Sequence, residues 1–256
     1  MHMTIIKLLV FIGWVLIGIQ VHATNNNLDP LDSPGWDVMH EFILDGEPVV
    51  FDDRVIINIP EFAEDPLNVP VSVKIEGIKD IQDIVVFADM NPIQKVLNFK
   101  PVKIEPYIAF RIKVEQSTPV RAAVKTPDGV WHVGGKWLEA AGGGCSAPSH
   151  GMVYGDWQQT LMNVSSRYWS KGDINRLRFR IMHPMDTGLA PGIPEFYVKN
   201  FSILNEAGQT LALLNTYQPI SENPVFTFEL KKNSSVEQLH LVGMDNNGNR
   251  LTATIQ

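Results

Sequence analysis

The sequence predicts an all-β protein made of two β-sandwich domains, joined by a glycine-rich segment that carries one cysteine. Apolar residues alternate with period two in many short segments, which is the pattern of half-buried strands. Turn residues separate these segments at short intervals, and helical periodicity is scarce. The chain has 256 residues, enough for two cores of about 100 residues each.

The first half contains five segments with strand patterns. In residues 69–75, three valines and one isoleucine share one face and polar residues occupy the other, as in a strand between core and solvent. Thr126-Pro127-Asp128-Gly129 is a turn signal, so the residues after it should return as a strand. The expected strands are residues 69–75, 83–88, 107–114, 120–124 and 130–137.

The second half repeats this pattern, with turn signals at residues 205–208 and 245–249. Its expected strands are residues 176–181, 195–204, 209–214, 225–230, 236–244 and 250–255. Helix is an alternative at residues 34–44 and 157–170, although the apolar stripe is incomplete in both. One group of apolar residues is too large for one side of a small core, so some members should face the other domain. The group is Phe196, Val198, Phe201, Leu211 and Leu213.

The charge of the chain is unevenly distributed. The 21 Lys and Arg against 28 Asp and Glu leave a formal charge of −7, which argues against general nucleic-acid binding. Residues 24–150 hold 11 basic and 19 acidic residues, whereas residues 151–256 hold nine of each. The different surface character of the two halves supports two modules.

Residues 1–23 have the pattern of a secretory signal peptide. Lys7 precedes an apolar run at residues 8–19, and Val21-His22-Ala23 fits a small-x-small cleavage site. An uncleaved membrane anchor is the alternative, but the run is shorter than the roughly 20 residues that span a bilayer. We expect an exported, periplasmic protein with no membrane segment after signal removal, and a lead-in segment at residues 24–44.

The only cysteine lies between the two halves, in a segment of small residues. Gly142, Gly143 and Gly144 precede Cys145, and this composition predicts a mobile arm over residues 140–156. A single cysteine excludes an intramolecular disulfide and a cysteine-rich metal site. A buried structural cysteine is the ordinary alternative, but nothing beside Cys145 has a core pattern, so we expect an exposed thiol.

An exposed thiol on a flexible arm is suited to carrying a covalent cargo into the active site of another protein. The partners would supply the chemistry, so no enzyme activity, cofactor or metal is expected of this chain. The thiol-enzyme alternative needs a rigid nucleophile beside a base. His150 is the nearest candidate base in sequence, and His132, His183 and His240 are distant.

Other groupings have weaker functional interpretations. Arg176, Arg178 and Arg180 should project from one face of a strand, either as a solvated face or as a patch for anions or a partner. Trp131, Trp137, Trp157 and Trp169 flank the arm, as core and interface residues or as an exposed docking rim. The sequence around His183 lacks metal-ligand spacing, residues 245–249 lack the calcium-loop pattern, and the acidic pairs 52–53 and 64–65 belong to strand edges or turns.

The same residues resemble the sulfur carrier SoxYZ with its two subunits fused. The motifs resembling SoxY are Ile59-Pro60-Glu61-Phe62-Ala63-Glu64, Asn68-Val69-Pro70-Val71, Asn91-Pro92, Phe110-Arg111-Ile112 and the glycine–cysteine arm. The motifs resembling SoxZ are His183-Pro184-Met185-Asp186-Thr187-Gly188, Ile193-Pro194-Glu195-Phe196, Ile220-Ser221-Glu222-Asn223-Pro224 and residues 245–249. The resemblance implies two immunoglobulin-like β-sandwich domains, SoxY-like at residues 45–139 and SoxZ-like at residues 157–256.

The resemblance also implies a function. SoxY carries oxidised sulfur intermediates on a cysteine in a C-terminal glycine-rich tail, which corresponds to Cys145. Here the cysteine is internal and followed by Ser146-Ala147-Pro148-Ser149, so the arm is tethered at both ends. This departure is typical of quinoprotein dehydrogenase-associated SoxYZ-like carriers. We expect periplasmic redox or sulfur-processing enzymes as partners, with a quinoprotein dehydrogenase among them. The alternative is a non-covalent accessory module for such a dehydrogenase.

Overall fold

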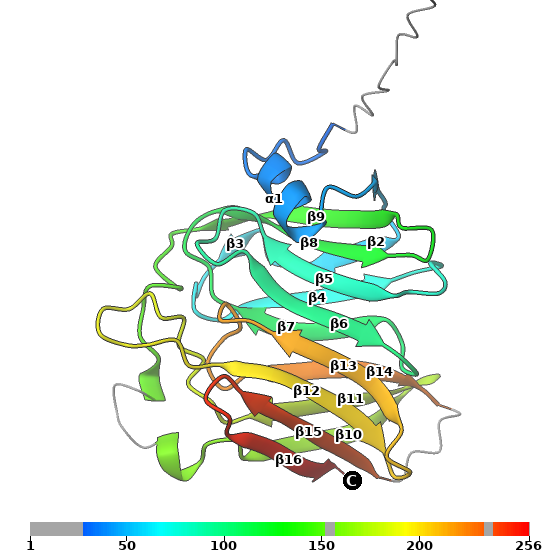
Figure 1. Cartoon of the computed structure of the whole chain (residues 1–256), viewed down its shortest axis with the longest axis vertical. Helices are drawn as coiled ribbons and strands as arrows, with labels where there is room; N and C mark the ends of the chain where they lie inside the picture. The colour runs from blue at the N-terminus through cyan, green and yellow to red at the C-terminus, as the bar shows by residue number, and fades with distance from the viewer. Residues whose placement is uncertain (1–27, 152–156, 233–237, 256) are drawn as a thin grey trace, which may run out of the picture.

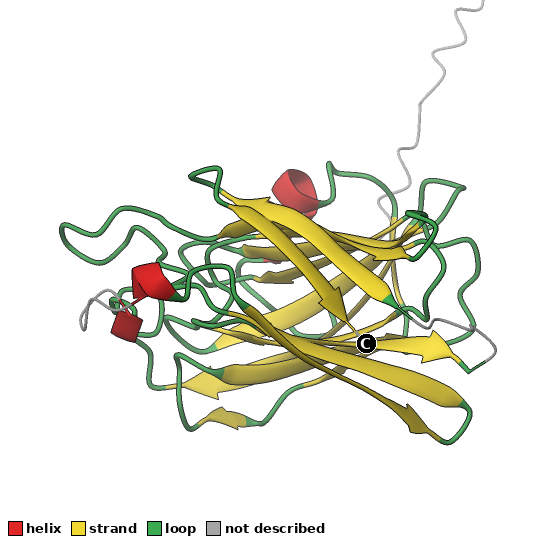
Figure 2. Cartoon of the chain, turned by 90° about the horizontal axis from the view of Figure 1, so that it is seen from below, coloured by secondary structure: helices red, strands yellow, loops and turns green. Residues whose placement is uncertain are grey.

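The computed structural model describes residues 28–151, 157–232 and 238–255. The described chain is a two-layer β-sandwich, in which two sheets stack around a shared apolar core (Figures 1 and 2). The expected all-β class is therefore confirmed. The signal-peptide prediction, and the later part of the predicted arm at residues 152–156, lie outside the described residues.

The elements follow the chain as shown in Figure 1. The first half contributes α1 (Trp36–Ile43), β1 (Val49–Phe51), β2 (Val55–Asn58), β3 (Phe62–Ala63), β4 (Val69–Ile75), β5 (Asp83–Ala88), β6 (Lys95–Pro101), β7 (Tyr107–Ile112), β8 (Thr118–Lys125) and β9 (Trp131–Ala140). The second half contributes η1 (Trp157–Gln159), β10 (Val164–Lys171), β11 (Ile174–Ile181), β12 (Val198–Asn205), β13 (Thr210–Thr216), β14 (Val225–Lys231), β15 (Leu239–Asp245) and β16 (Arg250–Ile255).

Each sheet runs without interruption through both halves. The ten-stranded sheet has the order β1-β9-β8-β5-β6-β13-β12-β15-β16, with β3 paired to β9, and it crosses between the halves at β6 and β13. Five residue pairs join those two antiparallel strands, from Thr216 opposite Leu97 to Ala212 opposite Pro101. The six-stranded sheet has the order β10-β11-β14-β7-β4-β2 and crosses between the halves at β14 and β7.

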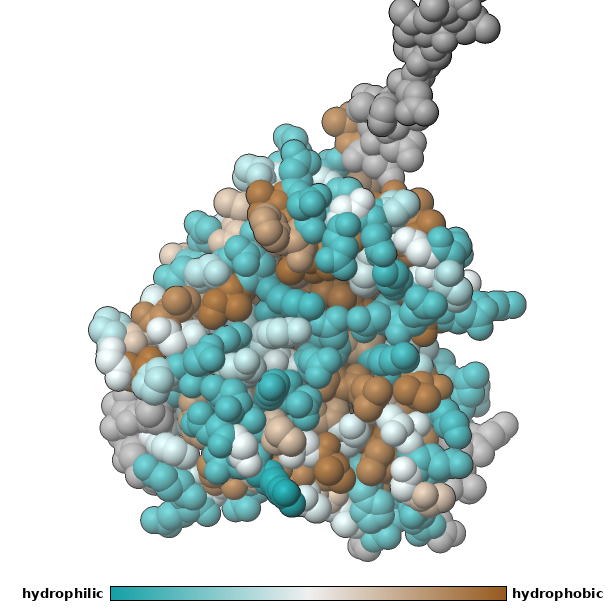
Figure 3. Space-filling view, viewed as in Figure 1, coloured by the Kyte–Doolittle hydropathy of each residue, from teal (hydrophilic) through white to brown (hydrophobic). Residues whose placement is uncertain are grey.

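The halves therefore meet through paired strand edges, which the sequence did not predict, and through an apolar core that both halves share. Phe196, Val198, Phe201 and Leu211 are all buried, and Val198, Phe201 and Leu211 belong to the core cluster that both halves share. Leu213 is 40% exposed, so its side chain lies outside the core, although its backbone pairs with Lys100 at the junction of the halves. Figure 3 shows the outer face of the ten-stranded sheet, where apolar side chains are scattered among polar ones. Pairing edges satisfies backbone hydrogen bonds that a separate sandwich would leave open.

The inner faces of both sheets form a single core. The rings of Phe99 from β6 and Phe228 from β14 meet edge to face, with centroids 5.7 Å apart. These two strands lie at the crossing points of different sheets, so the contact ties sheets and halves together at once. Removing either ring would open a cavity at the centre of the molecule.

Helix α1 covers the outer face of the ten-stranded sheet in the first half. Trp36 and Met39 point from it into a second apolar cluster with Phe87 of β5 and Trp131 of β9. This second layer explains why β8 is buried along almost its whole length. Of the two helix alternatives, residues 34–44 thus contain a helix, whereas residues 157–170 form η1 and strand β10. Among the described residues, no helix has the length and apolar character needed to span a membrane.

Candidate functional site

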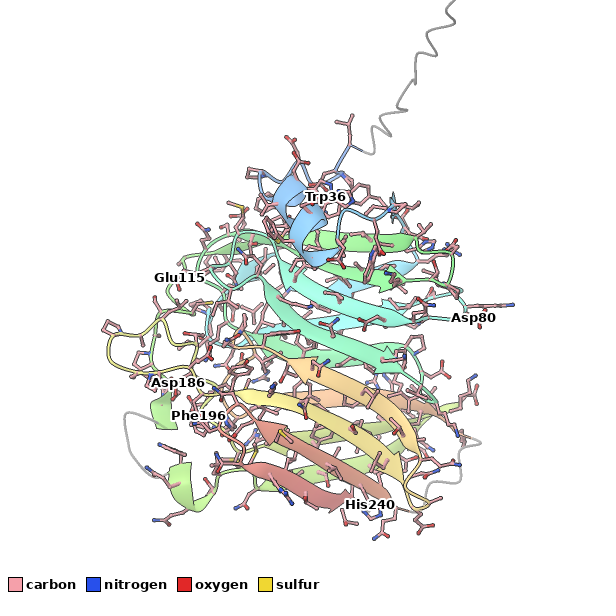
Figure 4. The ribbon with its side chains drawn as sticks, viewed as in Figure 1. Trp36, Asp80, Glu115, Asp186, Phe196 and His240 are labelled. Atoms are coloured by element: carbon pink, nitrogen blue, oxygen red, sulfur yellow. The ribbon has the colours of Figure 1, made fainter. Side chains whose placement is uncertain are left out.

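Cys145 lies where the two halves of the chain meet. It belongs to residues 141–151, which follow β9 and are called the cysteine segment below. Figure 4 shows Glu115, from the first half, and Asp186, from the second, on the same side of the molecule. The cysteine segment runs between them, because Cys145 bonds to Glu115 and Ser149 to Asp186.

The three glycines before Cys145 allow close packing. Gly142 and Gly143 adopt positive φ angles of 97° and 86°, a region that L residues rarely occupy. A Cβ on Gly144 would lie 2.2 Å from the carbonyl oxygen of Pro66, and one on Gly142 would lie 2.3 Å from that of Glu115. The backbone also bonds to the neighbouring strand end, through Gly144 N–H to the Val114 carbonyl at 2.9 Å. Because these glycines have no side chains, the backbone of the segment can lie directly against the sandwich.

Three carboxylates fasten the cysteine segment. Glu115 accepts hydrogen bonds from the Cys145 and Ser146 N–H groups at 3.0 and 2.9 Å and from the Ser146 hydroxyl at 2.9 Å. Asp186 accepts two bonds from Ser149, both at 2.9 Å. Glu222 accepts the N–H groups of residues 150 and 151 at 2.8 and 2.9 Å. Residues from both halves therefore determine the path of the segment.

The thiol is fully buried, which corrects the expectation of an exposed group on a mobile arm. Cys145 has no exposed surface, and its Sγ donates to the Lys113 carbonyl at 3.5 Å. Its own carbonyl accepts from the Thr187 hydroxyl at 2.5 Å. Burial raises the pKa of the Cys145 thiol to about 12, and the negative charge of Glu115 adds to this effect. At neutral pH such a thiol is almost entirely protonated, so this state is unreactive.

Lys113 is a part of the site that sequence reasoning missed. Its side chain is buried, and its ammonium group donates to the Met185 carbonyl. Burial lowers the pKa of Lys113, while the nearby Asp186, Cys145 and Glu222 raise it. The lysine also favours thiolate formation, but less strongly than burial opposes it. Lys113 is 32 residues from Cys145, and the alternation of residues 107–114 assigned it to the polar face, so its burial had no local signal.

None of the four histidines considered as a base hydrogen-bonds to the thiol within the described part of the chain. The ring of His183 is buried against Phe196. Its Nδ1 accepts the Met185 N–H at 3.0 Å, and its Nε2 lies 3.5 Å from Asp245. Burial lowers the pKa of His183 to about 4. The charge of Lys113, whose carbonyl contacts the thiol, also contributes to lowering the pKa of His183.

The other three histidines have their own environments. His132 pairs with Asp52 at 2.8 Å on β9, and His240 contacts Thr254 near the opposite end of the molecule from Glu115 (Figure 4). The backbone N–H of His150 bonds to Glu222. Across residues 28–151, 157–232 and 238–255, no three His, Cys, Asp or Glu side chains form a group able to hold a metal ion.

The arginines and tryptophans highlighted by the sequence are distributed differently. Arg176, Arg178 and Arg180 do project from the outer face of β11, but Arg176 is neutralised by Glu229 at 2.6 Å. The tryptophans do not form one rim around the arm. Trp131 is buried under α1, Trp137 is 38% exposed, Trp157 packs on Phe196, and Trp169 lies on β10 beside Arg167.

Comparisons with known proteins match both halves of the chain. The family model for sulfur oxidation protein SoxY matches residues 39–145, and that for sulphur oxidation protein SoxZ matches residues 164–256. No curated protein sequence matches the chain. A solved structure of the sulfur carrier protein SoxY from Chlorobium limicola f thiosulfatophilum is similar at 19% identity and a TM-score of 0.38, over 42% of this chain and 96% of that one. The chain therefore contains a SoxY domain followed by a SoxZ domain, which makes it a fused SoxYZ protein.

Proposed function

We propose that this protein is a periplasmic carrier that holds a sulfur-containing intermediate covalently on Cys145 and presents it to partner enzymes. The two families indicate a carrier in sulfur oxidation. The SoxY match ends at residue 145, which is the only cysteine of the chain. This observation supports the Cys145 sulfur as the attachment point of the cargo. Export by residues 1–23 would bring the carrier to the periplasm.

Carriage requires a second conformation in which the cysteine segment leaves the sandwich. The buried thiol has no room for an adduct and is protonated. Once released, its pKa would return toward the ordinary value of about 8.5, where a few per cent is thiolate at neutral pH. The bonds to Glu115, Asp186 and Glu222 are the contacts that release must break. They connect the segment to side chains at the edge of the sandwich, so the two sheets need not separate.

Loading would join the Cys145 sulfur to a second sulfur. The thiol and a sulfur compound HS–X form Cys–S–S–X, losing two protons and two electrons. The electrons must pass to a partner redox enzyme, for which we propose a periplasmic quinoprotein dehydrogenase or sulfur-processing oxidase. The carrier itself supplies the sulfur atom and its placement, and the partners supply the catalysis.

Intact-mass spectrometry of protein purified from its native host tests this proposal. We expect a mass increase that is removed by reductant and is absent in Cys145→Ser. A matched control combines Cys145→Ser with Thr252→Cys, which moves the thiol to an exposed position on β16. This control should restore a thiol without restoring function in a deletion-complementation assay. Full activity of Cys145→Ser would contradict carriage and favour a non-covalent accessory module for a dehydrogenase.

A further inference from the structure

The outer face of the six-stranded sheet gathers four exposed arginines from both halves of the chain. Arg167 lies on β10, Arg178 and Arg180 on β11, and Arg111 on β7. We call these four the basic face. Arg167 stands directly opposite Arg178 in the strand pairing. No carboxylate forms an ion pair with any of the four among the residues that the structure describes.

Three adjoining hollows cross the basic face. They have volumes of about 390, 310 and 210 Å³, and Val225 lines all three. Arg178 lines the first and second, Arg180 the second and third, and Arg111 the first and third. Each pair of neighbouring hollows therefore shares an arginine, and the three hollows together are called the groove below. The largest hollow is mainly apolar and is lined by Ile59, Pro60, Pro70, Val71 and Phe110 among others.

No ion pair among the described residues offsets the repulsion within the basic face. Like charges directly opposite each other destabilise a sheet, and the chain as a whole carries a formal charge of −7, so a basic composition does not explain the cluster. Arg176, the fifth arginine on this face, shows the contrast because it is paired with Glu229. A negatively charged partner would remove this repulsion, which makes the face complementary to an acidic surface.

The combination of apolar and basic lining residues indicates which kind of partner the groove would bind. A free inorganic anion would contact the guanidinium groups but leave the apolar lining uncovered. A protein segment with carboxylates around one apolar side chain satisfies both, since the apolar group fills the largest hollow and the carboxylates meet the arginines. The groove therefore fits an acidic protein segment better than a small ion.

The groove also borders the cysteine segment. Glu222, which lines the smallest hollow, is the carboxylate that holds the N–H groups of residues 150 and 151. Arg111 precedes by two residues Lys113, whose carbonyl accepts the Cys145 thiol. Two residues of extended chain span about 7 Å. A protein seated in the groove would thus lie beside the segment that must open.

We propose that the basic face is the docking site for an acidic segment, with one embedded apolar side chain, of the enzymes that load or unload Cys145. This inference rests on the proposed carrier function, since it names the surface by which partners reach the thiol. Docking here leaves the partner next to the cysteine segment and Glu222. The interaction weakens as salt concentration rises, because it depends on charge.

Selection from a random peptide library displayed on phage tests the chemistry of the face directly. The full chain is the target, and Arg178→Glu/Arg180→Glu is the variant. Arg250→Glu is the matched control, because Arg250 is an exposed arginine on β16 of the other sheet. Enriched peptides are expected to contain carboxylates around an apolar residue. They should bind the variant at least about tenfold more weakly than the wild type, and bind Arg250→Glu unchanged.

Other outcomes overturn the proposal. These are failure to enrich peptides, enrichment of neutral or basic peptides, and equal binding to the wild type and the double variant. Competition by sulfate or thiosulfate beyond that of chloride at equal ionic strength would indicate a small-anion site instead. Binding to phosphatidylglycerol vesicles that is lost in the double variant would indicate a membrane surface. Peptide binding does not require the thiol, so Cys145→Ser should bind the peptides as the wild type does. The binding experiment therefore tests the docking proposal separately from the carrier proposal.

Discussion

Replacing Glu115 with alanine should release the cysteine segment without unfolding the sandwich. The carboxylate accepts three hydrogen bonds, from the N–H groups of Cys145 and Ser146 and from the Ser146 hydroxyl. Each hydrogen bond contributes about 0.5–1.5 kcal/mol net. Because Glu115 is only half-buried, we take a value near the lower end for the three bonds together, about 2 kcal/mol. That free energy corresponds to a rise of about 30-fold in the open population.

Maleimide labelling of the folded protein, followed by intact mass, measures this population. The wild type should label slowly, because the thiol is buried and burial raises its pKa to about 12. Glu115→Ala should label about 30-fold faster, while the denaturation midpoint changes little. Glu105→Ala is the control, since Glu105 faces Lys231 at 3.6 Å and holds no part of the segment. Equal labelling of Glu115→Ala and wild type would refute the idea that Glu115 fastens the segment. Labelling of the wild type only through global unfolding would refute independent release.

Three further predictions concern the glycines, the core and acid stability. Gly144→Ala should speed labelling more than Gly143→Ala, because a Cβ on Gly144 meets backbone oxygen at 2.2 Å whereas one on Gly143 meets open space; faster labelling of Gly143→Ala, where φ is 86°, would show that φ strain outweighs that contact. Phe228→Ala should lower the free energy of unfolding by about 3–5 kcal/mol in urea denaturation, because the ring meets Phe99 where both halves join; a loss below about 1 kcal/mol would contradict the shared core. Burial lowers the pKa of His183 from its ordinary value of 6.5 to about 4 in the folded state. Between these two pH values the unfolded state therefore binds more protons than the folded state. Stability should therefore fall as pH drops from 6.5 toward 4, and His183→Asn should lose less over this range; parallel pH profiles would contradict the assignment.

Local pattern was sufficient for much of the sheet structure. In β4, alternation placed the apolar side chains of Val69, Val71 and Val73 inside, and they are buried. The same rule placed Arg178 and Arg180 on the outer face of β11, where they are exposed. This works because successive side chains of a strand point to opposite faces, so burial follows from neighbours in sequence.

Local pattern failed where the apolar residues of a strand do not alternate. Residues 157–170 have no clear alternation, and β10 is an edge strand with few buried side chains. β6 was not expected, although Val96, Leu97 and Phe99 are buried in it. Its adjacent apolar pair does not alternate, and a register shift lies beside it, between Val86 and Phe87 of β5.

The manner in which the halves join was decided by tertiary structure. A surplus of apolar residues in the second half predicted contact between the domains through sheet faces, and the pairing of strand edges was not predicted. Edge pairing of β6 with β13 and of β7 with β14 depends on backbone groups. Those groups are nearly the same in every residue, so side-chain pattern carries little information about which edges pair.

By itself the sequence determined that this is a β-sandwich protein of the SoxY and SoxZ type, with a single thiol after three glycines. It could not determine that the thiol is buried. Composition around Cys145 indicated an exposed, mobile arm because small residues have little to pack. The structure buries the segment with groups far away in the chain, since Glu115 is 30 residues before Cys145 and Asp186 is 37 after Ser149. Small residues leave room for other parts of the fold to approach, and only the assembled halves decide whether that room is filled by protein or by water.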